Sequence, residues 1–306
     1  MNLEFKTLDA KSMEEFKHYS AMRDIYMSEG TFINQFIWSN FYKTKYYVNE
    51  KYLFFLMKIN KQPATMIPFC KKEDILDAFL EMKRYFNEEL HLPLKIYNID
   101  KPTLEVLQES KEFNEEFKVI PSRDTSDYMY DGDKLRSLSG RALHKKKNHL
   151  NNFLKTYDGR YEYKTLNCEH IDAIKEFHLK WLEKRQIVDE RNLIESEETG
   201  VFKIFENCSL LDSKMGGIYV DGKLSAYSIG SYSPYTNCAF IHIEKANTTM
   251  NGLYNFINQQ FLIHEFPDAK LVNREDDLGH EGLRQSKMSY NPIYLVDKFH
   301  AFQKNE

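Results

Sequence analysis

His242 and Glu244 place an imidazole and a carboxylate two residues apart, in a run of strand-forming residues over 237–245. Because side chains alternate between the two faces of a β-strand, His242 and Glu244 are predicted to share one face and Lys245 to lie on the other. Such a pair could deprotonate an attacking amine or hydroxyl, with Glu244 as the base and His242 assisting it. The simpler alternative is a polar pair at a strand end. Both residues are therefore candidate catalytic residues.

A second polar cluster, Asn-Arg-Glu-Asp-Asp, occupies 273–277 at the end of a predicted strand over 270–274. Loops beyond strand ends are favoured binding positions, so part of this cluster could hold the amine of an acceptor or an attacking group. Asp276 is thus a third catalytic candidate, and Arg274 and Asp277 are candidates for substrate binding. Either aspartate could instead cap the next helix, which would account for one acid but not for three.

A predicted helix over 280–288 carries His280, Arg284 and Lys287 on one face, at positions i, i+4 and i+7. Arg284 and Lys287 could bind a phosphate of a lipid head group, a nucleotide or the end of a tRNA. The alternative is a solvated face whose charges pair with the acids at 275–277.

The stretch from Lys134 to Lys155 contains seven Lys or Arg residues and no acid. Helical spacing predicts that Lys145, Lys146 and Lys147 fan toward solvent. A basic stripe of this kind attracts polyanions such as tRNA, or an anionic membrane surface. An ordinary solvated helix exterior remains the alternative.

Several elements must position these residues. In the first part of the chain, an apolar stretch at 32–38 is too short to assign by its period. Helices are predicted over 11–22, 72–87 and 102–110, and strands over 45–48, 52–57, 63–68, 94–97 and 117–120. Residues 122–132 are turn-rich with one short aromatic strand, which places a domain boundary there, and Asp133 is predicted to cap the helical stretch that follows.

The second part of the chain gives the clearer pattern. Asp221-Gly222 predicts a tight hairpin turn within 216–228. Strands are predicted over 161–166, 237–245, 270–274 and 293–303, and helices over 169–186, 195–211, 252–265 and 280–288. This order, β-α-α-β-β-β-α-β-α-β, predicts an α+β domain with a mixed, largely antiparallel sheet flanked by helices.

Five local strings in this part carry a resemblance to a known family. They are Asp127–Tyr130, Leu138–Arg141 with Lys145–Asn148, Ile241–Asn247, Asn273–Gly279, and Glu281–Arg284 through Lys287–Tyr290. The chain resembles the C-terminal domain family of phosphatidylglycerol lysyltransferases, which are tandem GNAT-like proteins related in shape to the Fem aminoacyltransferases. The resemblance implies two GNAT-like domains, 1–132 and 133–306, with the family motifs in the second.

The resemblance also implies an activity. It is the transfer of an activated acyl group onto an amine or hydroxyl acceptor, such as a phospholipid head group. The co-substrate would be aminoacyl-tRNA or acyl-CoA, with no permanently bound cofactor. Where GNAT proteins have a glycine-spaced pyrophosphate loop, residues 247–252 hold one glycine, which favours aminoacyl-tRNA. The alternative is a non-catalytic GNAT-fold binding module for an anionic lipid, a nucleotide or RNA.

Composition limits the remaining classes. The chain has 306 residues and a formal net charge of −4, which argues against a general nucleic-acid binder. The longest apolar run, Tyr52–Met57, is too short to span a bilayer, so contact with anionic phospholipid would be peripheral. Four scattered cysteines are expected to be reduced, and no metal-ligand spacing is present. These features predict a cytoplasmic protein, and they fix no oligomeric state.

Overall fold

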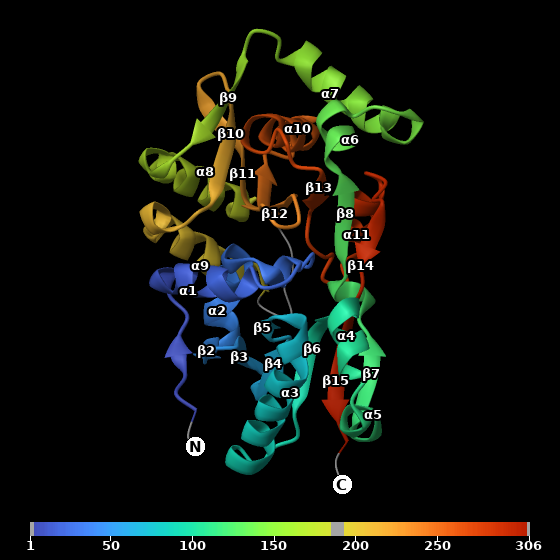
Figure 1. The fold of residues 1–306 in the computed structure, drawn as a ribbon. Helices are drawn as coiled ribbons and strands as arrows, with labels where there is room; N and C mark the ends of the chain where they lie inside the picture. Colours follow the sequence, from blue (N-terminus) through green and yellow to red (C-terminus); the bar gives the residue numbers. More distant parts are fainter. Residues whose placement is uncertain (1–2, 185–192, 305–306) are drawn as a thin grey trace. The chain divides into compact units, whose positions relative to one another are not determined.

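A computed structural model describes residues 3–184 and 193–304, which form two compact units (Figure 1). Unit 1 comprises Met1–Ser126 and Val296–Glu306, and unit 2 comprises Asp127–Leu295. Each unit has one mixed sheet with helices against it. The domain limits proposed from the sequence, 1–132 and 133–306, differ from these units at two strands, which are described below.

The sheet of unit 1 has the strand order β1-β2-β3-β4-β6-β15-β7, and β5 pairs with β3. Neighbouring strands run antiparallel where their pairing is defined, except that β4 and β6 are parallel. The strands are β1 (Lys6–Thr7), β2 (Lys45–Val48), β3 (Tyr52–Ile59), β4 (Gln62–Met66), β5 (Phe69–Cys70), β6 (Lys95–Asp100), β7 (Phe117–Pro121) and β15 (Lys298–Gln303).

The helices of unit 1 pack on this sheet through an aromatic core. The rings of Phe16, Phe55 and Phe69 contact one another and are almost fully buried. The helices are α1 (Met13–Ser20), α2 (Phe32–Tyr42), α3 (Ile75–Arg84), α4 (Lys101–Leu107) and α5 (Lys111–Glu116). The unassigned stretch at 32–38 is the start of α2. Most of its residues are buried, which explains why no amphipathic period is visible there.

The sheet of unit 2 has the order β14-β8-β13-β12-β11-β10-β9. β12 and β13 run parallel, β13 and β8 run antiparallel, and β9 to β12 form an antiparallel series. The strands are β8 (Asp127–Asp131), β9 (Tyr161–Leu166), β10 (Lys214–Val220), β11 (Lys223–Ser233), β12 (Cys238–Ala246), β13 (Leu271–Asn273) and β14 (Tyr294–Val296).

Helices cover both faces of this sheet. Along β11, a side chain at Gly230 would meet Phe261 of α10 (Leu253–Glu265), whereas Tyr227 contacts His178 of α8 (Ile171–Glu183). Side chains alternate between the faces of a strand, so residues 227 and 230, three apart, point to opposite faces. The helices that they contact, α8 and α10, therefore lie on opposite faces of the sheet (Figure 1). The remaining helices are α6 (Gly132–Ser137), α7 (His144–Thr156), α9 (Leu193–Glu206) and α11 (Glu281–Met288). The predicted end of the α8 helix at residue 186 lies outside the described residues.

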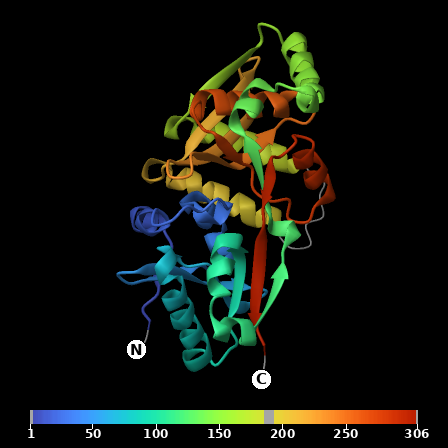
Figure 2. The same ribbon diagram turned by 45° about the vertical axis from the view of Figure 1, so that its right-hand side comes forward.

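The last strand of the chain returns to the first unit. β8 follows β7 in the chain and begins unit 2, where it pairs between β13 and β14. β15 follows β14 but pairs in the sheet of unit 1, between β6 and β7, where Figure 2 shows it in red beside the green β7. The sequence-based boundary at residue 132 therefore differs from the compact units at β8 and at β15.

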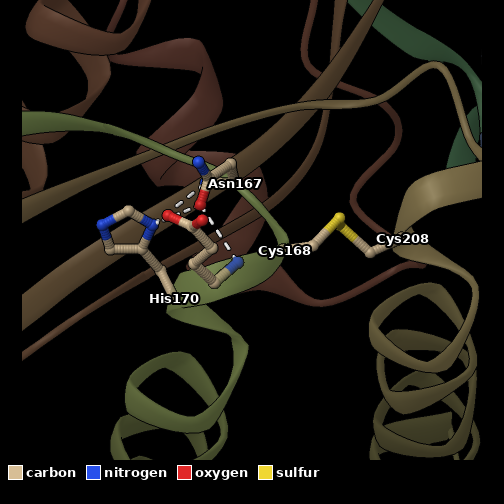
Figure 3. The surroundings of a disulfide bond; sticks show 5 residues. Asn167, Cys168, His170 and Cys208 are labelled. Carbon is tan, nitrogen blue, oxygen red and sulfur yellow. Dashed lines mark hydrogen bonds between the residues drawn. A yellow bond between two sulfur atoms is a disulfide. The ribbon is translucent and has the colours of Figure 1, made fainter.

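Two cysteines form a disulfide, Cys168–Cys208, which joins the segment before α8 to the segment after α9 (Figure 3). The expectation that all four cysteines are reduced is therefore wrong for this pair, which is 40 residues apart and meets only through the tertiary fold. Cys70 and Cys238 are reduced and buried. Burial raises the pKa of the Cys70 thiol to about 12.

Candidate functional site

The candidate site lies where β12 and β13 stop pairing. The parallel ladder runs from Cys238 opposite Leu271 to Phe240 opposite Asn273, and β13 ends there. β12 continues to Ala246 without β13 beside it. The segments that border this separation, 241–246 and 274–277, are those in which the sequence placed its candidate catalytic residues.

A bulge in β12 determines how these residues are presented. The register with β11 pairs Ile229 with Ile243 but Gly230 with Ile241, so His242 is an extra residue without a partner. A bulge of this kind re-aims side chains and breaks strict alternation. The sequence-based prediction that His242 and Glu244 share a face assumed an unbroken period of two.

His242 and Glu244 consequently have different partners. The His242 side chain is fully buried, with Nδ1 2.8 Å from Oε1 of Glu275 and Nε2 2.8 Å from Oγ of Ser231. Because both ring nitrogens are engaged, this imidazole is held between β11 and the 274–277 segment. The predicted pairing of His242 with Glu244 is therefore wrong, and Glu275 is the carboxylate that contacts the imidazole.

Glu244 pairs with the other side of the separation. Arg274 donates from Nη2 to its Oε1 at 3.0 Å, and Asn258 of α10 donates from Nδ2 to its Oε2 at 3.0 Å. Two buried atoms of this trio, Nη1 of Arg274 and Oδ1 of Asn258, have no hydrogen-bond partner in the described residues. One donor and one acceptor, both on side chains that the same carboxylate holds, are thus left unsatisfied in a buried position.

Aromatic rings surround Arg274. Its guanidinium carbon lies 4.7 Å from the ring centroid of Tyr290 and 5.9 Å from that of Tyr130, within cation–π range. Burial raises the pKa of Tyr130 and raises that of Tyr290 to about 12, so both phenols are neutral at pH 7. The hydroxyl of Tyr290 accepts a hydrogen bond from Nδ2 of Asn255 at 2.7 Å.

Asp277 is held by three donors. Arg284 binds both of its oxygens, through Nε at 2.9 Å and Nη2 at 3.0 Å, and the Tyr128 hydroxyl donates to Oδ2 at 2.5 Å. The backbone N–H of Gly279 also donates to Oδ1. Burial raises the pKa of Asp277, but these hydrogen bonds outweigh it and hold the pKa at about 2.

Arg284 and Lys287 therefore turn toward the 274–277 segment. Lys287 is half-buried, and the loss of hydration around its amine lowers its pKa; the amine donates to the backbone carbonyls of Arg274 and Asp276. Of the two sequence-based interpretations of this helix, pairing with the neighbouring acids describes the contact of Arg284 with Asp277, whereas Lys287 binds backbone carbonyls of the same segment. Neither Asp276 nor Asp277 is the N-cap of α11, which is His280, and Asp276 accepts from the backbone N–H of Leu278.

Upstream, Asp131 rather than Asp133 caps α6, because its Oδ1 accepts from the N–H of Lys134 at 2.9 Å. Of the three lysines predicted to fan toward solvent, Lys145 and Lys147 are exposed, but Lys146 is half-buried, with its amine 4.2 Å from the Tyr290 ring centroid. An open pocket of about 710 Å³ lies beside α7. It is lined by Leu138, Ser139, Gly140, Arg141, Ala142, His144, Lys145 and Lys147.

Helix α7 packs against the turn at 247–252. Gly252 has φ +87°, and a Cβ there would lie 2.1 Å from the carbonyl oxygen of His149. The glycine thus permits the close approach of a helix backbone, where a GNAT pyrophosphate loop would leave its N–H groups open to phosphate.

Sequence reasoning missed Asn258 and Ser231. Asn258 is a buried amide three residues before the buried Phe261 of α10, so a polar residue on a core-facing helix position was the available signal. No comparable signal pointed to Ser231. Within residues 3–184 and 193–304, no helix has the length and apolarity needed to cross a bilayer.

Comparisons place this architecture among known proteins. A model of the family described as phosphatidylglycerol lysyltransferase, C-terminal, matches residues 21–302. A conserved protein of unknown function from Bacteroides thetaiotaomicron superposes with a TM-score of 0.88 at 25% identity, covering 99% of this chain and 100% of that one. L-PGS from Bacillus licheniformis superposes with a TM-score of 0.68 at 11% identity, over 98% and 94%.

A GNAT-family acetyltransferase from Colwellia psychrerythraea covers both chains completely, with a TM-score of 0.51 at 11% identity. At these low identities the last two likenesses establish the fold alone. The fold is α+β and tandem GNAT-like, as the sequence predicted.

Proposed function

The chain belongs to the phosphatidylglycerol lysyltransferase C-terminal family, and from this premise we propose that it is an aminoacyl- or acyltransferase. It would move an activated acyl group onto an amine or hydroxyl acceptor. The observation that carries this proposal is the trio of Glu244, Arg274 and Asn258 at the point where β12 and β13 separate.

The two unpartnered atoms of the trio fit an aminoacyl group. Nη1 of Arg274 is a donor that suits the carbonyl oxygen of an ester, and Oδ1 of Asn258 is an acceptor that suits an α-ammonium. Since negative charge develops on the carbonyl oxygen during acyl transfer, a fixed guanidinium donor would stabilise the transition state more than the ground state. Holding both groups also supplies orientation, which lowers the barrier further.

The residues predicted to be catalytic take more specific roles in this proposal. Both oxygens of Glu244 are occupied by donors, so it would orient Arg274 and Asn258. His242 with Glu275, and the turn containing Asp276, would fix the border of the site. Asp277, Arg284 and Lys287 would hold that border in place through the contacts described above.

The donor we propose is aminoacyl-tRNA. One observation supports it over acyl-CoA, the packing of His149 against Gly252. The basic pocket lined by Arg141, Lys145 and Lys147 suits the phosphates of either donor. A polyanion would bind such a surface through its phosphates. The acceptor we propose is an amine or hydroxyl such as a phospholipid head group, reached by peripheral contact from the cytoplasm, and no permanently bound cofactor takes part.

Incubating the purified chain with charged tRNA pools, acyl-CoAs and a lipid extract, followed by mass spectrometry of all products, tests this proposal. We expect an aminoacylated product that depends on charged tRNA and disappears in Arg274→Met. Equilibrium binding of each donor gives an independent measurement. Tight acetyl-CoA binding without tRNA binding would reverse the choice of donor, and saturable binding without any product would support the binding-module alternative.

A further inference from the structure

Lys146 occupies a core-facing position of α7. It lies four residues before Leu150 and seven before Phe153, and both of these are buried in the core of unit 2. Its neighbours Lys145 and Lys147 are exposed. Helix geometry therefore turns one amine of the basic stretch inward, to a place that an apolar side chain would normally fill.

This inward turn brings the amine to the candidate site. The Nζ atom lies 4.2 Å from the ring centroid of Tyr290, and the same ring lies 4.7 Å from the guanidinium carbon of Arg274. Arg274 in turn holds Glu244 at 3.0 Å. No carboxylate pairs with Lys146 in the part of the chain that the structure describes, so its amine is not neutralised by a local acid.

Burial and the neighbouring cations disfavour the charged form of Lys146, against the attraction of an ammonium to the face of the Tyr290 ring. Burial, then the positive charge of Arg274, then that of Lys145 lower the pKa of Lys146 to about 8. Lys147 is on the same helix, Tyr290 contributes a neutral phenol, and the carboxylate of Glu244 is paired with Arg274. An amine that titrates close to neutral pH can both accept and return a proton under ordinary conditions.

We propose that Lys146 is the general base of the transfer reaction, a role that rests on the proposed function. As the amine or hydroxyl of the acceptor attacks the ester carbonyl carbon, a new N–C or O–C bond forms and the acceptor proton moves to Nζ of Lys146. The acyl C–O bond to the donor then breaks, and the leaving oxygen takes the proton from the lysine ammonium. Lys146 ends the cycle neutral, and no further reactant is needed.

Lys146 suits this role better than Glu244. Both oxygens of Glu244 already accept hydrogen bonds, from a guanidinium and from an amide, so this carboxylate is engaged in holding Arg274 and Asn258. The amine of Lys146 lies over the face of the Tyr290 ring and pairs with no carboxylate among the residues that the structure describes. Because the sequence assigned Lys146 to phosphate binding, the two roles make opposite predictions. A base must be neutral, whereas a phosphate ligand must be charged.

The test is the pH dependence of transfer by the wild-type protein and three variants. If Lys146 is the base, the wild-type transfer rate rises about tenfold per pH unit below pH 8 and is constant above it. The transfer rates of Lys146→Ala and Lys146→Arg are each lower than that of wild type by about 10²–10⁴-fold. Adding methylamine restores part of the activity of Lys146→Ala. Lys155→Ala, an exposed lysine at the far end of α7, is the matched control and retains full activity.

A rate that falls above pH 8, or an active Lys146→Arg protein, overturns the role of Lys146 as base while leaving the transferase proposal intact. The absence of transfer by wild type with every donor overturns both. A separate measurement needs no turnover, since trace acetylation followed by mass spectrometry reports the titration of each amine. Half-maximal labelling of Lys146 near pH 8 is expected, and labelling like that of an ordinary lysine overturns the proposal.

Discussion

Arg274 and Glu244 connect the two segments that separate at the end of the β12–β13 ladder. Nη2 of Arg274 lies 3.0 Å from Oε1 of Glu244. The exposed fractions of their side chains are 13% and 10%, so water screens this pair little. The ion pair therefore fixes the distance between strand and loop at the point where the ladder no longer does so.

Removing one partner of this pair should be costly. Glu244→Gln leaves a buried guanidinium without its counter-charge, which typically lowers the free energy of unfolding by about 3–5 kcal/mol. The double variant Glu244→Gln with Arg274→Met should regain much of that stability and still show no transfer. Urea unfolding of wild type, of each single variant and of the double variant measures the coupling free energy between Glu244 and Arg274. If the single variant is as stable as wild type, the pair does not fix the site.

Asp277 should make stability depend on pH in acid. Its pKa is held at about 2 in the folded protein against about 3.9 in an unfolded chain, so its contribution is complete above pH 4 and is lost as the pH falls through 2. The difference corresponds to a loss on the order of 2–3 kcal/mol. Urea unfolding between pH 2 and 5 should show this loss in wild type and a flatter profile in Asp277→Asn. Equal dependence of stability on pH in the two proteins would show that the hydrogen bonds to Asp277 do not stabilise its charged form.

Lys145 and Lys147 line the basic pocket beside α7 and should govern donor affinity through charge. Replacing both by Ala should weaken tRNA binding and reduce the slope of log affinity against log salt by about one unit per lysine. Melting temperature should change little, because both side chains are exposed. Lys155→Ala, on the same helix but outside the pocket, is the control. A slope unaffected by the double replacement would locate polyanion binding elsewhere.

Gly252 and Gly222 offer a matched comparison of backbone sites. Both have positive φ, +87° and +75°, so replacement by Ala costs about 1–2 kcal/mol of backbone strain at each. Only at Gly252 does the added Cβ meet another backbone, at 2.1 Å from the His149 carbonyl oxygen, and this overpacking should cost about 1–3 kcal/mol more. Denaturant midpoints of the two variants measure the difference. Equal midpoints would show that α7 does not cover this turn.

The disulfide should stabilise the protein mainly by restricting the unfolded chain. Cys168 and Cys208 are 40 residues apart, and a loop of that length corresponds to about 4 kcal/mol in the chain-entropy view. Peptide mapping without reductant should find this one cross-link, and dithiothreitol should lower the melting temperature of wild type but not of Cys168→Ser. Cys70 and Cys238 should react with thiol reagents only after unfolding, because both are buried.

Much of the fold could be predicted from hydrophobic period and turn residues. Strand β9 and helix α10 were placed within a residue, since each has a regular pattern and clear ends. The sheet to which β8 and β15 belong could not be predicted in this way, because each has the local pattern of an ordinary strand and its partners are set by contacts remote in sequence.

The candidate site was predicted in part. Sequence alone located the segments that meet at the end of the β12–β13 ladder, because polar residues at strand ends are visible in one dimension. The sequence-based prediction that His242 and Glu244 share a face of the strand was wrong, because the bulge at His242 interrupts the alternation of side chains. It also placed Lys146 with its exposed neighbours, although the spacing from Leu150 already indicated the core-facing side of α7.

The position of β15 constrains how this polypeptide can be divided or recombined. A single cut between β7 and β8 leaves the first fragment without β15 between β6 and β7, and leaves β15 in the second fragment without the strands it pairs with. Halves made separately should be insoluble unless co-expressed, whereas a permuted gene that appends β15 after β7 should yield an autonomous first half. Gene shuffling that separates residues 1–126 from residues 296–306 would meet the same obstacle.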